Sequence, residues 1–457
     1  MRKKLALVGV GGVVGTLLLA SPAAAQDELS ADVVQTALDN VWVLVAAVLV
    51  IFMQAGFALL EAGGTRAKNV GNIVMKNLMD FMVGVIAFFA VGFALAFGEG
   101  NDIIGWKGFF LEGGDFDFGT ITLPTYFVFQ VAFAATAATI TSGAMAERTK
   151  FRSYLIYSAA ITAFIYPVVV HWVWGGGWLS QRETPFVDFA GSTIVHGVGG
   201  WAALMGAFFL GPRLGKYGAD GKARAILGHS TPFVVLGTLI LLVGWYGFNP
   251  GSQLAADPVI GKIALTTTLA AAAGAVTSMI LEWIKTGKPQ VSMTCNGVIA
   301  GLVAITAGCA AVDAWAALLI GAVAGIVVVL SVSFFDKVKI DDPIAAISVH
   351  GVAGAWGTIA VGLVGAEALV GENYGLFLGG GADLLVTQII GVVSVFVFVV
   401  VTAGALFAAL KYTIGLRVSE EEEIMGLDAH EHGLTGYADF VLHEGQVGDE
   451  VAEPVLT

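Results

Sequence analysis

The sequence predicts an all-α protein that crosses a membrane many times. Of its 457 residues, 57% are hydrophobic and only 12% are charged. A soluble chain of this length could not cover so much apolar surface with polar side chains. The 61 glycines support the same fold class, because helices in lipid pack closely through small residues. A hexapeptide that occurs twice inside apolar segments further predicts two related halves.

Residues 1–25 are predicted to be a cleavable signal peptide. Basic side chains occupy positions 2–4, an apolar stretch covers 5–19, and three alanines at 23–25 form a suitable cleavage site. The alternative is an uncleaved first span, but this stretch is rich in glycine and short for a spanning helix. Cleavage would leave the mature N-terminus outside the cell.

Eleven apolar segments follow, and each is predicted to be a transmembrane helix. Their approximate limits are 40–62, 71–98, 124–146, 153–174, 188–211, 230–249, 259–284, 292–310, 313–335, 343–365 and 385–415. The transmembrane domain is expected over residues 26–416. Within it we expect a first five-helix repeat at about 40–211, a second at about 230–365, and a final helix at about 385–415. Residues 417–457 are expected to form an acidic tail.

The charge distribution predicts the orientation. Connections on one side of the predicted membrane carry 15 Lys and Arg residues, whereas those on the other side carry only Lys107, Arg182 and Lys262. Basic loops stay in the cytoplasm, so the acidic tail is predicted to be cytoplasmic. The formal charge is −13, of which residues 417–457 contribute −10. The acidity therefore belongs to the tail and says little about a substrate.

The repeated hexapeptide contains the candidate functional residues. Residues 195–200 read VHGVGG and residues 349–354 read VHGVAG, which places His196 and His350 at matching positions. Ionisable groups at membrane depth are expensive, and they commonly mark a substrate or proton pathway. The predicted topology sends segment five inward and segment ten outward, as in transporters built from inverted repeats. The surrounding glycines would let the two imidazoles meet.

An aspartate precedes each histidine by eight residues, Asp188 before His196 and Asp342 before His350. Asp188 begins its segment, where an N-cap carboxylate accepts backbone N–H bonds and offsets the helix dipole. We interpret both aspartates as structural supports. A lone buried histidine is commonly a satisfied core residue, but duplication at matched offsets argues against that reading here.

These features, with further motifs, resemble the ammonium transporter (Amt/Mep/Rh) family, in its Amt branch. The resemblance extends from residue 40 to about residue 440. It is carried by residues 129–133 (FQVAF), 143–148 (GAMAER), 174–177 (WGGG), 188–191 (DFAG), 247–252 (GFNPGS), 341–343 (DDP) before His350, 415–423 (GLRVSEEEE), 426–428 (GLD) and 432–433 (HG).

The resemblance implies an outer recruitment site for ammonium formed by Trp174, Phe133 and Ser252, and a gate of stacked rings formed by Phe133 and Phe248. An indole face attracts a cation, and a serine hydroxyl can accept an N–H bond. The alternative for such tryptophans is an interfacial aromatic belt, which we retain for Trp172 and Trp178.

Beyond the gate, the resemblance implies a twin-histidine pair of His196 and His350. Two neutral imidazoles can accept a hydrogen bond from ammonia or ammonium and relay a proton. Potassium offers neither a donor nor a proton. The resemblance also implies a homotrimer in the lipid bilayer, and a cytoplasmic tail that couples subunits and contacts a P-II signal protein. Glu420–Glu423 could instead be a solvated run.

Three alternatives remain at this stage. The chain could be an ammonium sensor of the same family that signals through its tail. It could be a haem or metal protein ligated by His196 and His350, although the glycines favour a closer approach of the histidines. A hydrolytic or redox enzyme is the least favoured alternative, since the sequence has no HExxH, no GxSxG at a membrane boundary, and no dinucleotide loop supported by strands. We expect no cofactor, no metal ligation by Cys295 and Cys309, and no nucleic-acid partner.

Overall fold

The computed structural model describes residues 30–437, and within that range it confirms an all-helical membrane protein. No strand occurs in the described part of the chain, and ten helices there are long and apolar enough to cross a membrane. An eleventh, α11 (Val291–Ile305), is apolar but shorter. The predicted signal peptide and the end of the acidic tail lie outside the described residues.

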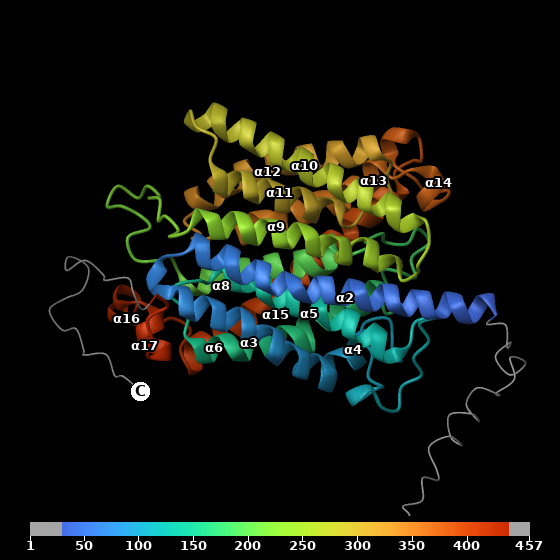
Figure 1. Ribbon diagram of the computed structural model, residues 1–457, viewed down its shortest axis with the longest axis horizontal. Helices are drawn as coiled ribbons and strands as arrows, with labels where there is room; N and C mark the ends of the chain where they lie inside the picture. Colours follow the sequence, from blue (N-terminus) through green and yellow to red (C-terminus); the bar gives the residue numbers. More distant parts are fainter. Residues whose placement is uncertain (1–29, 438–457) are drawn as a thin grey trace, which may run out of the picture.

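The helices follow the predicted order (Figure 1). The first half comprises α2 (Ala31–Gly64), α3 (Val70–Ala87) with α4 (Phe93–Phe97), α5 (Leu123–Ala144), α6 (Phe151–Ala160) with α7 (Tyr166–Val173), and α8 (Val198–Leu210). The second half comprises α9 (Thr231–Phe248), α10 (Val259–Thr286), α11, α12 (Ala314–Lys337) and α13 (Ala353–Val364). The short α14 (Glu367–Val370) and the long α15 (Asp383–Thr413) follow, and α16 (Glu420–Met425) and α17 (Leu427–His432) belong to the tail.

The two halves run in opposite directions where they meet. Helices α2 and α9, which begin the two halves, lie side by side along their length (Figure 1). The start of α9 contacts the end of α2, because Ser230 N donates to the Gly63 carbonyl at 3.1 Å. Antiparallel first helices are what an inverted repeat produces, as the sequence predicts.

Two segment boundaries differ clearly from the predicted ones. Helix α2 begins at Ala31 rather than near residue 40, and the Ser30 side chain, which accepts from Val33 N, caps about two and a half extra turns. Helix α11 ends at Ile305 rather than near 310. The carbonyls of Thr306 and Ala307 accept bonds from the backbone of the loop before α8, so this segment leaves the helix.

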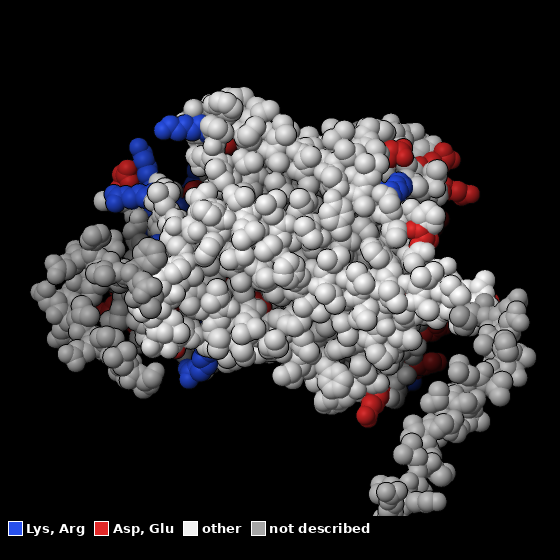
Figure 2. All heavy atoms as spheres, in the orientation of Figure 1, with Lys and Arg blue, Asp and Glu red and all other residues white. Residues whose placement is uncertain are grey.

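The surface divides into charged ends and an uncharged middle (Figure 2). Lys and Arg gather at the end of the molecule that carries α16 and α17 in Figure 1, whereas the opposite end carries mostly Asp and Glu. Large apolar side chains on the outer helices are exposed between the two ends, among them Ile86, Phe208 and Val401. Such a band suits contact with lipid.

A buried ion network ties the two halves together at the basic end. Arg213 donates two hydrogen bonds to the carboxylate of Asp341, at 2.9 and 3.0 Å, and a third to Glu147 at 3.2 Å. Arg148 donates to the Asp341 carbonyl. Burial alone would raise the pKa of Asp341, but the bonds and charges of Arg213 and Arg148 hold it below its usual range.

The tail packs on this basic end. Glu423 is buried, accepting from Leu214 N and forming an ion pair with Arg417. Asp428 accepts from the backbone N–H groups of Gly71 and Asn72 at the start of α3. The alternative of a solvated acidic run is therefore wrong for Glu423, whose carboxylate fixes the tail to the membrane domain.

The close crossing of the two halves at the histidine segments predicts a stability difference between two glycines. A Cβ at Gly200 would lie 2.2 Å from Gly351 N, whereas a Cβ at Gly197 would meet nothing nearer than 3.6 Å. We expect Gly200→Ala to destabilise the protein by about 1–3 kcal/mol through overpacking, and Gly197→Ala to leave it near wild type. Thermal unfolding of the two purified variants in detergent provides the comparison, and equal unfolding temperatures would refute this account of the crossing.

Candidate functional site

The two predicted histidines meet in the interior of the helix bundle. His196 Nδ1 lies 3.2 Å from His350 Nδ1, and both side chains are buried. At this distance one ring donates its N–H and the other accepts, so the two imidazoles hold different tautomers. His196 Nε2 meets no hydrogen-bond partner within residues 30–437. The pair thus keeps ring nitrogen capacity for a ligand.

Each histidine lies in a π-helical segment, a feature that the sequence did not predict. His196 belongs to η6 (Ser192–Gly197) and His350 to η8 (Ile347–Val352), and each segment leads directly into the α-helix that follows. A π-helical turn holds one more residue than an α-helical turn and often marks a functional position. Here it changes the direction in which the imidazole leaves the helix.

Aspartates hold the starts of both segments. The Asp188 carboxylate accepts four backbone N–H bonds, from residues 191–194, at 2.8–3.0 Å. The N-cap residue of this segment is Gly191, at φ 113°. Asp188, the predicted N-cap, lies three residues before it. Asp342 accepts from Ile347 N at 2.7 Å. The four N–H donors of residues 191–194 favour the ionised form of the Asp188 carboxylate.

Aromatic rings lead from Trp174 to the histidine pair. Phe133 contacts Trp174 edge-on at 6.2 Å between ring centroids, and it contacts Phe248 at 4.3 Å. Phe248 in turn stacks on His196 at 5.1 Å. The Ser252 hydroxyl donates to the Phe248 carbonyl at 2.7 Å, which leaves its oxygen lone pairs available. All four predicted outer residues therefore belong to one connected group.

Sequence reasoning missed Trp245. Its ring stacks on His196 with centroids 5.1 Å apart and planes 17° apart, while its indole N–H donates to Thr306. Trp245 precedes Phe248 by three residues on α9, so both rings lie on one helix face. The three-residue spacing between Trp245 and Phe248 was the sequence feature that could have indicated this role. Together they hold the His196 ring in one orientation.

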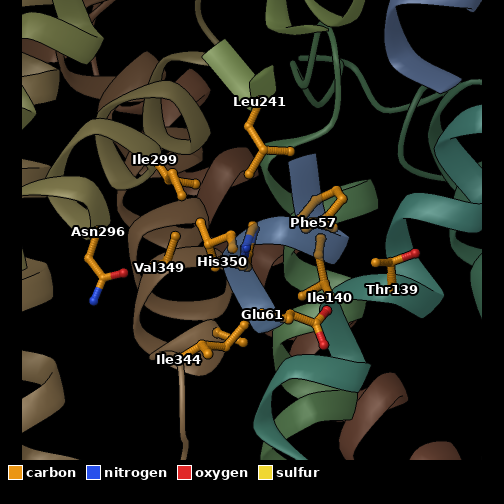
Figure 3. A pocket seen from close by; sticks show the side chains of 12 residues that line it. Phe57, Glu61, Thr139, Ile140, Leu241, Asn296, Ile299, Ile344, Val349 and His350 are labelled. Atoms are coloured by element: carbon orange, nitrogen blue, oxygen red, sulfur yellow. The ribbon is translucent and has the colours of Figure 1, made fainter. Parts of the chain in front are cut away.

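On the other side of the pair lies a small cavity (Figure 3). Its lining residues come from both halves of the protein and are Phe57, Leu60, Glu61, Thr139, Ile140, Leu241, Asn296, Ile299, Ile344, Ala346, Val349 and His350. Glu61 is the acidic member, and sequence reasoning missed it. The signal was an acidic residue within a predicted span. Glu61 lies near the end of α2, which places this cavity toward the basic end of the molecule.

The geometry of the pair disfavours the haem reading. Two histidines on opposite faces of a haem iron need nitrogen atoms roughly 4 Å apart, twice a metal–imidazole bond of about 2.0 Å. The observed 3.2 Å is instead a hydrogen-bond distance. Cys295 and Cys309 are both buried and unpaired by a disulfide. Within residues 30–437 no group of three or more His, Cys, Asp or Glu side chains is arranged to hold a metal ion.

Comparison of the sequence with known proteins points in one direction. The family model described as "Ammonium Transporter Family" matches residues 41–437. The "Ammonium transporter Amt2" of Archaeoglobus fulgidus is 50% identical over 424 residues, covering 90% of each chain. The "Ammonium transporter 1 member 3" of Solanum lycopersicum is 41% identical, over 89% of this chain and 94% of the tomato protein.

Solved structures agree on the fold. A structure titled "Sensor Amt Protein" superposes with a TM-score of 0.83 at 38% identity, covering 87% of this chain and 99% of that one. The "Crystal structure of Candida albicans Mep2" superposes with a TM-score of 0.77 at 30% identity, covering 84% of this chain and 87% of that one.

The backbone N–H bonds to Asp188 predict that its substitution destabilises the protein. An asparagine at position 188 would offer one acceptor oxygen in place of two, leaving about two buried N–H groups without a partner. We expect Asp188→Asn to destabilise the protein by about 2–6 kcal/mol, at roughly 1–3 kcal/mol for each orphaned donor. The control is Asp313→Asn at the start of α12, where the aspartate makes no side-chain capping bond. Thermal unfolding that responds equally to both changes would contradict the role given to Asp188.

Proposed function

The chain belongs to the ammonium transporter family, and from this premise we propose that it moves ammonium, or ammonia with a proton, across the cytoplasmic membrane past His196 and His350. The observation that carries the proposal is the bond between the two buried imidazoles. It lies at the end of the aromatic column formed by Trp174, Phe133 and Phe248. Family membership makes the chain a multi-pass membrane protein of a transporter family. The relatives' names point away from an enzyme.

Recruitment begins at the outer group of Trp174, Phe133 and Ser252. The Trp174 indole N–H is held by the Asp188 carbonyl at 3.0 Å, which fixes the ring against rotation. A cation over the indole face gains about 0.5–2 kcal/mol, depending on desolvation. Because the Ser252 hydroxyl donates its proton to the Phe248 carbonyl, its oxygen can still accept an N–H bond from ammonium.

Phe133 and Phe248 act as the gate. Their rings lie 4.3 Å apart and are both buried, so a hydrated ion cannot pass between them without movement of a ring. A cation that enters must shed water, and a site that replaces that water is then needed. Methylammonium should be accepted as an analogue, since it keeps N–H donors.

The histidine pair provides the discrimination. Burial disfavours charge on imidazole, so the resting pair is neutral. A neutral pair with a free ring nitrogen accepts a hydrogen bond from ammonia or ammonium and can relay a proton. Potassium, similar in size, can neither donate a hydrogen bond nor lose a proton. Asp188 and Asp342 support this function by fixing the segments that carry the histidines.

The orientation follows from the charges. Support comes from the gathering of Lys and Arg at the end that carries α16 and α17, which the positive-inside rule assigns to the cytoplasm. The mature N-terminus would then lie outside, after removal of the signal peptide at 1–25. A homotrimer, and a P-II signal protein bound at the cytoplasmic tail, complete the proposal. The docked Glu423 and Asp428 give the tail a fixed surface for such contacts.

A second candidate is an ammonium sensor of the same family. The observation in its favour is the high similarity to the structure titled "Sensor Amt Protein". A sensor binds ammonium and changes the tail without net transport. Ammonium binding to purified protein, without flux in vesicles that hold the same protein, would favour this reading.

The transport proposal predicts a selective current. In protein reconstituted on a solid-supported membrane, an ammonium jump should evoke a transient current, and an equal potassium jump should evoke none. The double variant His196→Ala with His350→Ala should lose at least 90% of the ammonium current or admit potassium, because the proton-relaying bond is gone.

The matched control is His171→Ala. The His171 ring is buried and contacts the carbonyls of Ala96 and Asn101, and no ring contact joins it to Trp174, Phe133 or Phe248 within residues 30–437. Unchanged methylammonium uptake and selectivity in the double variant would overturn the mechanism. If the wild type gives no current, a dye for internal pH in the same vesicles separates electroneutral ammonia passage from sensing.

A further inference from the structure

Glu61 lines the cavity beside the histidine pair, and only one of its two carboxylate oxygens accepts a hydrogen bond in the described part of the chain. It is fully buried on α2, three residues before the helix ends at Gly64. Figure 3 shows it among the residues that line the same cavity as His350. The Ser142 hydroxyl donates to Glu61 Oε2 at 2.9 Å, while Oε1 meets no hydrogen-bond partner within residues 30–437. Asn77 also acts on this carboxylate, but its amide nitrogen donates to the Ile73 carbonyl at 3.0 Å, and Oε1 stays open to a partner from outside the chain.

The bonds behind Glu61 fix its position. Lys76 Nζ donates to the Ser142 hydroxyl oxygen at 3.1 Å, so the proton of Ser142 must point to Glu61. Lys76 is itself buried and lies 5.2 Å from the ring centroid of Tyr154. The Tyr154 hydroxyl donates to Asp80, which is also buried.

This cluster contains two carboxyl groups, Glu61 and Asp80, and one amine, Lys76. With all three ionised it would carry a net charge of −1 inside an apolar bundle, which is costly without a compensating cation or proton. Other charges face it: Asp342 acts on Glu61, and Arg148 and Glu147 act on Lys76.

Arg148 and Glu147 belong to the ion network at the basic end. There they have partners of their own, Asp341 for Arg148 and two arginines for Glu147. They do not supply the missing positive charge. The cluster therefore has room for one more proton or cation. Glu61 Oε1 and Asp80 Oδ1 both lack a hydrogen-bond partner within residues 30–437, and of the two residues it is Glu61 that lines the cavity beside His350.

We propose that Glu61 is the proton acceptor on the cytoplasmic side of the histidine pair. The inference rests on the proposed function. His350 Nδ1 is engaged with His196, which leaves Nε2 as the ring nitrogen that can exchange a proton through the cavity. Thr139 and Asn296, other polar lining residues, do not take up a proton at neutral pH.

The step balances in atoms and charge. Ammonium gives one proton to the histidine pair and continues as ammonia. The N–H bond of the resulting imidazolium then breaks, its electron pair stays on the ring nitrogen, and an O–H bond forms on Glu61. Glu61 finally releases the proton to cytoplasmic water and returns to the carboxylate. Three residues of helix, about 4.5 Å of rise, separate it from the end of α2.

Infrared difference spectroscopy on the purified full-length protein tests Glu61 without requiring transport. When ammonium replaces potassium, the protonated-carboxyl band should change in the wild type and not in Glu61→Gln. Glu282→Gln is the control, since Glu282 is also buried but forms an ion pair with Lys285 and lies on α10, outside the cavity lining. The proposal is overturned if the wild type shows no such change, or if Glu61→Gln retains it.

Vesicle measurements then test the consequence. In Glu61→Gln, the ammonium-evoked current should fall at least tenfold, while ammonia entry still raises the internal pH. Glu61→Asp should recover part of the current because it restores an acceptor. Wild-type current in Glu61→Gln would overturn the role of Glu61. Absence of both current and internal pH change in the wild type would instead refute the proposed transport, and the infrared result would still decide the titration of Glu61.

Discussion

The hydrogen bond between two buried imidazoles is the interaction on which the rest of this structure depends. It is possible only if the segments that carry His196 and His350 approach until their backbones touch. Gly200 and Gly351 permit that approach, since a Cβ at the former would overlap the backbone of the latter. In lipid there is little hydrophobic gain from helix association, so close packing of small residues must supply the attraction.

The approach also constrains the local backbone. An α-helical turn would direct the two rings differently, and both segments instead adopt a π-helical turn. Such a turn loses regular hydrogen bonds, and an acidic side chain supplies acceptors at its start. Asp188 and Asp342 thus act on the histidines through the backbone, without contact to the imidazoles. The duplicated spacing of eight residues has this physical origin.

The sequence was sufficient for whatever depends on composition and repetition. Hydrophobic length predicted the spans, and the repeated hexapeptide predicted that His196 and His350 meet. It was insufficient where one residue of register or one neighbouring element decides. Nothing in the sequence distinguishes a π-helical turn from an α-helical one at His196. Similarly, its position within a predicted span marks Glu61 as unusual, but its place in a cavity depends on helices distant in sequence, which no local pattern reveals.

The two halves place their histidines alike but differ in the residues around them, and under the proposed transport this difference gives the pathway a direction. On the side of Trp174 the histidine pair faces aromatic rings, which attract a cation without binding its proton. On the side of Glu61 it faces a carboxylate with an unpaired oxygen, which attracts a cation and can take its proton. An exact inverted repeat would present the same chemistry to both sides of the membrane. In the proposed mechanism, the departure from symmetry in the residues around the pair therefore separates recruitment of the cation from release of its proton.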